Sequence, residues 1–441
     1  MGETIPAVKG TRDFYPEDFA LLDAIISAWR RASIRHGFCE YEGPTLEHTE
    51  LYTRKSGDEI VEQLFTLTDR GGRSLALRPE MTPTLARMVA ARASSLPRPI
   101  KWFCVARMYR GERPQRGRLR EFYQWNADVL GVESEVADAE CILVAVDGLR
   151  ALGLTAADVV VRISDRRVVS ALLEEADIPA ERLGEALGLL DRASRLPAEE
   201  AARQWEASLG RYVAFGGLWE RLSAGSLESL GGGARVTEAS GAARALLERL
   251  QDCGILEFCK TDFHIVRGLA YYTGPVFEIH DRGGQLRAVC GGGRYDDLLA
   301  GVGGDPLPAV GFGMGDVVLL ELLRDLGRLP AAAAGGADVF VIRAQEGGGE
   351  GWASAASRAA LGLVAALRRG GYVADFAYEA QSVAKQMKRA AARGAKAVLF
   401  VGAETSDRGV VTIKDMASGR QREAPLADLL ANPAAVLGPK G

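Results

Sequence analysis

The chain has 441 residues, enough for two or three domains that each bury a core of their own. Hydrophobic residues make up 47% and charged residues 25% of the sequence, and a net charge of −4 excludes a protein coated with positive charge for nonspecific nucleic-acid binding. No apolar run is long enough for a membrane span, and the first residues lack the apolar core of a secretory signal. We therefore expect a cytoplasmic protein without a membrane partner.

The cysteine and histidine content predicts neither a disulfide framework nor a metal centre. Six cysteines are spread along the chain without short paired spacings. Cys253 and Cys259 are the nearest two in sequence, and only four histidines could add further ligands. We expect no zinc site, and no metal held by the protein alone.

The first part of the chain has the patterns of helices and antiparallel strands. Residues 17–36 show the apolar spacing of an amphipathic helix, and residues 75–78 that of a short strand. A second helix is predicted to begin with Thr82 and Pro83, with Thr82 as its cap. The strand-like runs IKWFCVARMYR and LREFYQWNADVLG are separated by GERPQRG, which predicts a hairpin.

Changes in composition divide the remainder of the chain. Helical spacing rich in Ala, Leu, Glu and Arg between 166 and 254 predicts an insertion that splits one mainly antiparallel α/β domain. After the linker LPAAAAGGA, strands and helices alternate as in a small α/β domain with a mixed sheet. The predicted boundaries are 1–165 and 255–328 for the split domain, 166–254 for the insertion, 329–337 for the linker, 338–432 for the second domain and 433–441 for a tail.

The second strand of the predicted hairpin has two unlike faces. Because side chains of one face recur every second residue, Phe122, Gln124, Asn126 and Asp128 share a face, and the opposite face is apolar. This polar row fits a solvated sheet face. It also fits the floor of a ligand site in which an amide and a carboxylate meet a small cation such as an α-amino group.

Five arginines lie between residues 109 and 120, in or beside the hairpin loop. Like charges this close repel, so the cluster needs counter-charge from Glu112, Glu121 or a bound polyanion. Guanidinium groups suit phosphate oxygens, whereas a solvated basic loop is the plainer alternative.

The glycine-rich segment GGGRYDD at 291–297 matches neither of the common nucleotide-binding loops. It lacks the GxxxxGK[ST] spacing of a phosphate-binding loop and the GxGxxG spacing of a dinucleotide site. We interpret its glycines as making room for a flat ligand.

Five segments occur in the order and spacing of class II histidyl-tRNA synthetases, and the resemblance covers nearly the whole chain: LRPEMTPTLAR, YRGERPQRGRLREFYQ, VRGLAYYTGPVFE, GGGRYDDLL and AVGFGMG. The opening KGTRDFYPED is also similar to the start of that family. The resemblance implies an α/β (α+β) fold, with a class II antiparallel-sheet catalytic domain, a helical insertion and a C-terminal α/β anticodon-binding domain with a mixed sheet. It implies a homodimer that uses L-histidine, ATP with Mg²⁺, and histidine tRNA.

The resemblance also implies roles for individual residues. Histidine would be held by Glu80, Thr82, Gln124, Asp128, Tyr271, Tyr272 and Tyr295. Within this group, Glu80 and Asp128 would face the ammonium group and the tyrosines would wall the imidazole. Arg110 and Arg267 would be catalytic and grip the α-phosphate from two sides. The ATP-binding residues would be Arg110, Glu112, Arg118, Phe122 and Arg267, with adenine stacked near Phe122.

The implied reaction has two steps. The histidine carboxylate attacks the α-phosphorus of ATP, giving histidyl-adenylate and pyrophosphate, and the terminal adenosine hydroxyl of the tRNA then takes the histidyl group. No protein nucleophile is needed, so catalysis would come from positioning and fixed positive charge.

Two positions depart from the pattern of the family. Val318 stands where motif 3 of class II enzymes usually carries an arginine for the γ-phosphate, and Ala270 stands where aspartate is commoner. Arg113 or Arg118 could hold the pyrophosphate end of ATP instead. Ala270 would remove a supporting hydrogen bond.

A basic helix face is predicted in the second domain, because Lys385, Arg389, Arg393 and Lys396 recur at intervals of three and four. A solvated face is the alternative. In an anticodon-binding domain, Lys385, Arg389 and Arg393 would contact tRNA phosphates.

Two other functions compete with the ligase. A histidine-binding regulatory paralogue of the kind that partners ATP phosphoribosyltransferase typically lacks the C-terminal domain and has lost the arginines. This chain has the C-terminal domain and retains Arg110, Arg118 and Arg267. A tRNA-sensing binding module would need an effector segment, and none is visible in the sequence.

Overall fold

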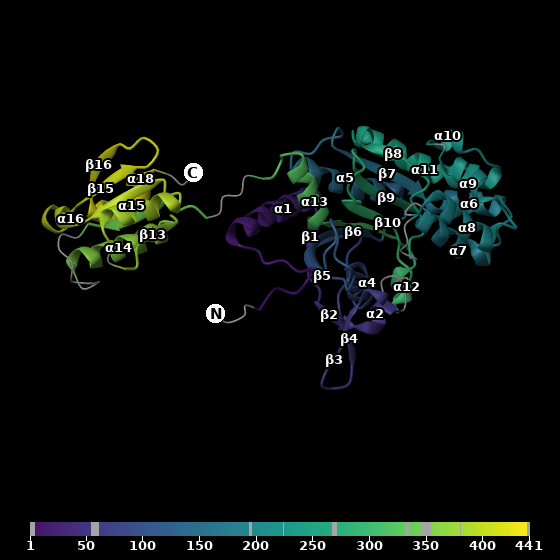
Figure 1. The fold of residues 1–441 in the computed structure, drawn as a ribbon, viewed down its shortest axis with the longest axis horizontal. Coiled ribbons are helices and arrows are strands. Elements are labelled where there is room, and N and C mark those ends of the chain that lie inside the picture. The colour runs from purple at the N-terminus through teal and green to yellow at the C-terminus, as the bar shows by residue number, and fades with distance from the viewer. Residues whose placement is uncertain are drawn as a thin grey trace. The chain divides into compact units, whose positions relative to one another are not determined.

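The computed structural model describes residues 5–53, 61–193, 196–223, 225–266, 271–330, 335–344, 354–379 and 381–438. The chain forms two compact units, residues 1–331 and 332–441 (Figure 1). Within the described residues, no helix has the length and apolar character needed to cross a bilayer.

An eight-stranded sheet organises the first unit, in the order β1-β5-β6-β11-β10-β9-β7-β8. The strands are β1 (Cys39–Glu40), β5 (Ile100–Tyr109), β6 (Glu121–Leu130), β7 (Val159–Asp165), β8 (Cys259–Thr261), β9 (Pro275–Asp281), β10 (Cys290–Arg294) and β11 (Ala309–Gly315). The two outermost pairs are parallel and the inner pairs are antiparallel. This confirms the predicted antiparallel α/β catalytic fold.

The predicted hairpin is β5 and β6, with Ile100 opposite Leu130 and Tyr109 opposite Glu121. On the apolar face of β6, Trp125 packs between Trp29 and Phe312, at ring distances of 5.8 and 4.9 Å. Trp29 belongs to α1 (Pro16–Arg35), the helix predicted at 17–36, and α5 (Glu135–Arg150) completes the core on this side of the sheet. The alternation along β6 therefore separates a core face from a polar face, as predicted.

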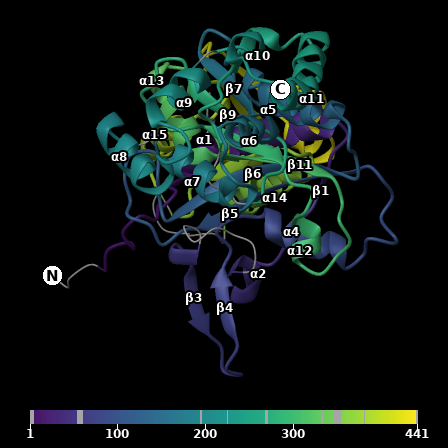
Figure 2. The same ribbon diagram turned by 90° about the vertical axis from the view of Figure 1, so that its right-hand side faces the viewer.

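Smaller elements surround the polar face of the sheet. They are β2 (Leu46–His48), α2 (Thr49–Thr53), β3 (Phe65–Thr68), β4 (Ser74–Leu77), α4 (Thr82–Ala90) and α12 (Leu298–Gly301). Helix α13 (Asp316–Asp325) follows β11 and instead packs into the core on the apolar face, through Leu319, Leu322 and Leu323. Figure 2 shows β3 and β4 projecting from the body of the unit as an antiparallel hairpin. The predicted capping role of Thr82 is wrong, because Met81 occupies the N-cap of α4 and makes no side-chain capping bond.

A group of helices lies at one side of the sheet (Figure 1). They are α6 (Arg166–Glu175), α7 (Leu183–Ala193), α8 (Ala198–Leu209), α9 (Phe215–Leu222), α10 (Leu227–Leu230) and α11 (Ala234–Asp252). Leu172, Leu190, Trp205 and Leu218 are buried in a core that belongs to this group. The segment predicted to be helical is thus a layer with its own packing.

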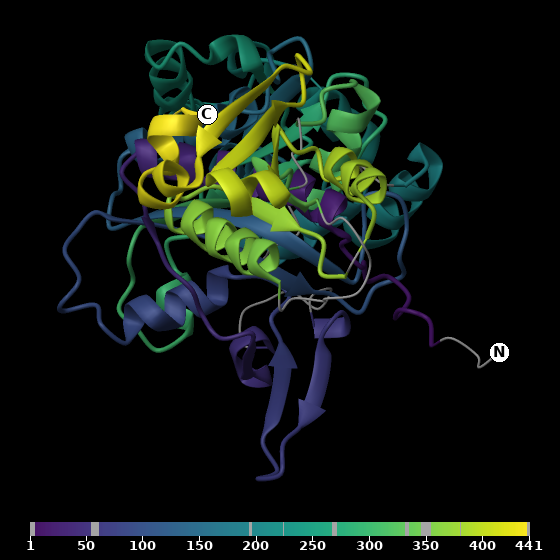
Figure 3. The ribbon, with the colours of Figure 1, turned by 90° about the vertical axis from the view of Figure 1, so that its left-hand side faces the viewer.

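The second unit has a five-stranded mixed sheet in the order β13-β12-β14-β15-β16. The strands are β12 (Val339–Arg343), β13 (Ala374–Phe376), β14 (Ala397–Val401), β15 (Val410–Asp415) and β16 (Gln421–Pro425). Helices α14 (Ala355–Arg369) and α17 (Leu426–Ala431) pack on one face, and α15 (Val383–Ala392) packs on the other. Figure 3 shows this unit in green and yellow; α16 (Ala403–Arg408) and α18 (Pro433–Leu437) complete it.

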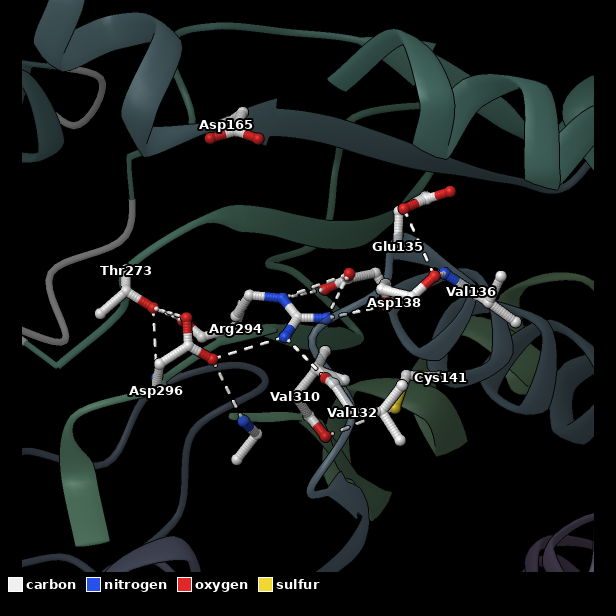
Figure 4. A network of polar contacts seen from close by, with 12 residues as sticks. Val132, Glu135, Val136, Asp138, Cys141, Asp165, Thr273, Arg294, Asp296 and Val310 are labelled. Carbon is white, nitrogen blue, oxygen red and sulfur yellow. Dashed lines mark hydrogen bonds and ion pairs between the residues drawn. The ribbon is translucent and has the colours of Figure 1, made fainter. Parts of the chain in front are cut away.

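A buried ion pair joins the end of β10 to α5 (Figure 4). The Arg294 guanidinium lies 2.6 Å from the Asp138 carboxylate, and both side chains are about 5% exposed or less. Arg294 also donates to the carbonyl oxygens of Val132 and Ser134, at 3.0 and 3.1 Å. Because nearly all its donors are used, Arg294 fixes the chain immediately before Tyr295 against the core helix.

We expect Asp138→Asn to lower the free energy of unfolding by about 3 kcal/mol, because it leaves the Arg294 charge buried without its partner. Urea denaturation followed by circular dichroism measures this. Glu133→Gln removes an exposed carboxylate from the preceding turn and is the control, with an expected change within about 0.5 kcal/mol. Equal stabilities of Asp138→Asn and the unsubstituted protein would contradict a structural role for the pair.

Candidate active site

A cavity of about 510 Å³ opens on the polar face of the large sheet. Its floor is formed by Gln124 and Asn126 of β6 and by Gly311 and Gly313 of β11. Its volume lies within the usual range for sites that hold a small organic ligand. The polar row predicted on β6 therefore faces a cavity.

Glycines on β11 make room for the polar side chains of β6. Gly311 pairs with Asp128 and Gly313 with Asn126. A Cβ atom on Gly311 would lie 1.9 Å from Asp128 Oδ1, and one on Gly313 would lie 2.8 Å from Gln124 Nε2. Any larger residue at these two positions would displace the floor.

Aromatic side chains form one wall of the cavity. Tyr271, Tyr272 and Tyr295 line it, and the ring of Tyr271 lies 5.1 Å from that of Tyr272 and 5.9 Å from that of Tyr295. The Tyr271 hydroxyl donates to Glu80 Oε2 at 3.0 Å, and Thr82 lies on the same lining. The structure thus brings these predicted histidine-binding residues together, from three distant parts of the chain.

Asp128 lies one layer below the cavity rather than on its lining. It is 1% exposed, accepts the Tyr295 hydroxyl at 2.5 Å, and its Oδ2 has no hydrogen-bond partner among the described residues. Burial raises the pKa of Asp128 to about 7, and the bond from Tyr295 opposes this rise. A donor from a bound molecule would satisfy the second oxygen.

Asn126 is a cavity residue that we did not assign to ligand binding from the sequence. It lines the cavity, is 4% exposed, and its Oδ1 has no hydrogen-bond partner among the described residues. Its position in the polar row, between Gln124 and Asp128, is the sequence pattern that could have identified it as a ligand-binding residue.

The predicted ATP-binding residues that the structure describes also meet at the cavity. Arg110, Glu112, Arg118 and Phe122 all line it. Arg110 Nε donates to the Pro79 carbonyl at 3.0 Å, and its guanidinium lies 5.1 Å from the centre of the Phe122 ring. Arg118 forms an ion pair with Glu112. Arg267 and Ala270 lie outside the described residues.

Other arginines of the hairpin loop hold the loop in place. Arg116 contacts Glu321 and Asp325 of α13, at 2.8 and 2.9 Å, and Arg120 donates to the Glu112 carbonyl at 3.2 Å. The loop is therefore neither a purely solvated basic segment nor a cluster aimed wholly at a ligand.

Val318 contributes an apolar patch to the cavity, at the start of α13. It is 8% exposed, and a Cβ atom on Gly117 of the loop would lie 3.2 Å from its Cγ2. Arg118 lines the cavity, whereas Arg113 is not among the lining residues. Of the two substitutes considered from the sequence, only Arg118 is at the site.

The remaining wall carries titratable groups that sequence reasoning did not single out. Arg162 lies 3.6 Å from Asp262, which also contacts His264 at 3.2 Å. On β9, His280 Nε2 lies 2.9 Å from a carboxylate oxygen of Glu278. These residues line the cavity, and no local motif marks them in the sequence.

The predicted basic residues of the second unit differ in how they are paired. Lys385 and Arg389 lie exposed on α15, with no side-chain partner among the described residues. Arg393 lies 3.0 Å from Asp375, and Lys396 lies 2.9 Å from Asp338. The unpaired basic face is therefore narrower than the spacing of the four residues predicts.

Comparisons with known proteins agree with this arrangement. Residues 10–316 match the family model described as histidyl-tRNA synthetase, and residues 338–432 match the anticodon binding domain. A histidine–tRNA ligase from Opitutus terrae is 40% identical over 96% of both chains. The chloroplastic/mitochondrial histidine–tRNA ligase of Arabidopsis thaliana is 38% identical over 96% of this chain and 85% of its own length.

Among solved structures, histidyl-tRNA synthetase from Nostoc superposes with a TM-score of 0.76, at 22% identity, covering 98% of this chain and 99% of that one. At that identity the superposition supports the fold alone. The family match over most of the chain and the two full-length relatives carry the assignment. The chain belongs to the histidyl-tRNA synthetase family, which makes it a class II aminoacyl-tRNA ligase.

Proposed function

We propose that this chain joins L-histidine to histidine tRNA, and that the cavity on the large sheet forms the histidyl-adenylate. The observation that carries the proposal is the meeting of an acid-lined aromatic pocket, formed by Glu80 and three tyrosines, with Arg110 in one cavity. The match of residues 338–432 to an anticodon binding domain favours a ligase over the regulatory paralogue.

Histidine would occupy the aromatic part of the cavity. The Glu80 carboxylate supplies negative charge for the ammonium group, and Thr82 and Gln124 add polar contacts beside it. The rings of Tyr271, Tyr272 and Tyr295 enclose a volume suited to a flat imidazole. Asp128 would accept a hydrogen bond through its free oxygen, from below the lining.

ATP would occupy the side of the cavity near the hairpin loop. Arg110 is held by the Pro79 carbonyl and by the face of Phe122, so its guanidinium is oriented before a phosphate arrives. A fixed cation beside the α-phosphate reduces the repulsion between two anionic reactants and stabilises the charge of the transition state. Arg267 is proposed to act from the other side of this phosphate, and adenine to stack near Phe122.

Mg²⁺ is proposed to accompany ATP. The ion usually binds through one or two carboxylates together with phosphate oxygens and water, so it needs no complete protein cage. Glu278 lines the cavity and offers a carboxylate of this kind. When bound, the ion would neutralise part of the triphosphate charge.

The second unit is proposed to bind the anticodon arm of the tRNA through Lys385 and Arg389, with Arg393 contributing once Asp375 releases it. We also propose that the protein is a cytoplasmic homodimer. The proposed domain limits are those predicted from the sequence, with the helical group at 166–254 inserted into the catalytic domain.

The direct test is histidine-dependent exchange between ATP and labelled pyrophosphate. We expect exchange with histidine and none without it. Arg110→Ala should lower the rate about 100-fold or more, since it removes a charge that acts on the reacting phosphate. Arg324→Ala, an exposed arginine of α13 outside the cavity, is the control. Absence of exchange by the folded, unsubstituted protein would reject the proposed activity.

We expect Asp128→Asn to weaken histidine binding more than ATP binding, because it removes a negative charge below the histidine pocket. Isothermal titration with each ligand measures the two changes. Equal losses for both ligands would place Asp128 in another role.

The same variant tests the raised pKa of Asp128. The folded state holds the proton of this carboxyl group more tightly than the unfolded state. The contribution of the group to the free energy of unfolding is therefore fully present below about pH 4 and is lost as pH rises to about 7. Asparagine does not titrate, so the Asp128→Asn variant does not show this loss of stability. Its unfolding free energy relative to the unsubstituted protein should rise by on the order of 2 kcal/mol between pH 5 and pH 8. Parallel pH profiles from urea denaturation would contradict this.

For the second unit, we expect a Lys385→Ala, Arg389→Ala double variant to lower tRNA affinity and leave pyrophosphate exchange unchanged. The slope of binding against salt should fall by up to about one unit for each phosphate that the variant no longer neutralises. The control is the pair Arg369→Ala, Arg420→Ala, two exposed arginines away from α15. Equal effects of the two double variants would remove the proposed role from α15.

A further inference from the structure

We propose that Arg287 binds the terminal phosphates of ATP, in place of the motif 3 arginine whose position in α13 is occupied by Val318. Arg287 is exposed and lines the cavity, in the segment that leads into β10. This inference rests on the proposed function, because it assigns a residue to the ATP that the cavity would hold.

The register of the sheet brings Arg287 to the start of α13. Cys290 of β10 pairs with Met314 of β11, and the Gly315 amide donates to the Val289 carbonyl at 3.3 Å. Arg287 is two residues beyond this last hydrogen bond, alongside the point where β11 gives way to α13. Val317 and Val318, at that point, line the same cavity. A guanidinium from the neighbouring segment can therefore serve the region that Val318 leaves without charge.

The charges of the cavity single out Arg287. Among the arginines that the described residues contribute to the lining, Arg118 is paired with Glu112, and Arg162 lies 3.6 Å from Asp262. Glu80 and Glu112 act on Arg110 as nearby negative charges. Arg287 has no hydrogen bond or ion pair with any described residue. An uncompensated guanidinium at the edge of a cavity is suited to an anionic ligand.

The arginines of the hairpin loop are less suited to this task. Arg116 is held by Glu321 and Asp325 of α13, and Arg113 does not line the cavity. Gly117 lies against Val318, so the loop covers this part of α13 with an apolar contact. The chemistry that Arg287 can supply is a forked contact to the oxygens of a β- or γ-phosphate, or of pyrophosphate.

The test compares nucleotides that differ only in the terminal phosphates. For Arg287→Gln we expect the ATP dissociation constant, measured by calorimetry with Mg²⁺, to rise about tenfold or more, while AMP binding stays unchanged. The KM for pyrophosphate in the exchange reaction should rise similarly, with the KM for histidine unchanged. Arg287→Lys should retain part of the affinity, because a point charge still attracts phosphate.

Arg324→Gln is the matched control, since Arg324 is exposed, unpaired among the described residues and outside the cavity. It should leave all of these constants unchanged. Unchanged ATP affinity in Arg287→Gln would overturn the assignment while leaving the proposed function intact. Equal losses for ATP and AMP would also overturn it, because a contact to the terminal phosphates cannot affect AMP. Failure of the unsubstituted protein to bind ATP would reject the proposed function and this assignment together.

Discussion

Between Gly311 and Gly315, strand β11 must present side chains on one face only, and the active site depends on that constraint. Phe312 and Met314 point into the core beneath the sheet, whereas Gly311 and Gly313 face the cavity. Glycine within a strand costs about 0.5–1 kcal/mol relative to alanine. Burial of the large residues on the opposite face offsets this cost. The open face is then free for the amide and carboxylate groups of β6.

Glycine also leaves room for a neighbouring side chain on β10, where that side chain is Tyr272. A Cβ atom on Gly293 would lie 2.8 Å from the Tyr272 ring, so the space beside this glycine is filled by the protein itself. The glycines thus make room for the aromatic wall of the pocket as well as for the polar side chains of its floor. Arg294, which follows directly, is tied to α5 through Asp138 and holds this wall in place. Core packing and pocket shape are therefore coupled through one strand end.

The electrostatics of the cavity follow from how its charges are paired. Arg118 has a carboxylate partner, Arg110 lies near two carboxylates, and Glu80 accepts the Tyr271 hydroxyl, so these groups are oriented without a ligand. Asp128 differs from these three groups, because one of its oxygens has no partner among the described residues and its pKa is raised to about 7. Such a group lowers stability at neutral pH and gains a partner when a donor binds. Asp128 therefore lowers the stability of the protein at the position where the proposed substrate, histidine, would be bound.

The sequence by itself determined the main elements and the two faces of β6. The period of two along residues 121–130 identified the polar row of β6, and the helical period between 166 and 254 identified the added helices, because both signals are local. The resemblance of five motifs then identified the family, which the comparisons confirmed. Only the tertiary structure decided which faces meet. Tyr271 and Glu80 are 191 residues apart in the chain, and no local pattern encodes their hydrogen bond. The bond of Asp128 to Tyr295, the pairing of Arg116 with α13 and the presence of Arg287 and Val318 in one cavity depend on strand order and register, which arise from packing across the whole sheet.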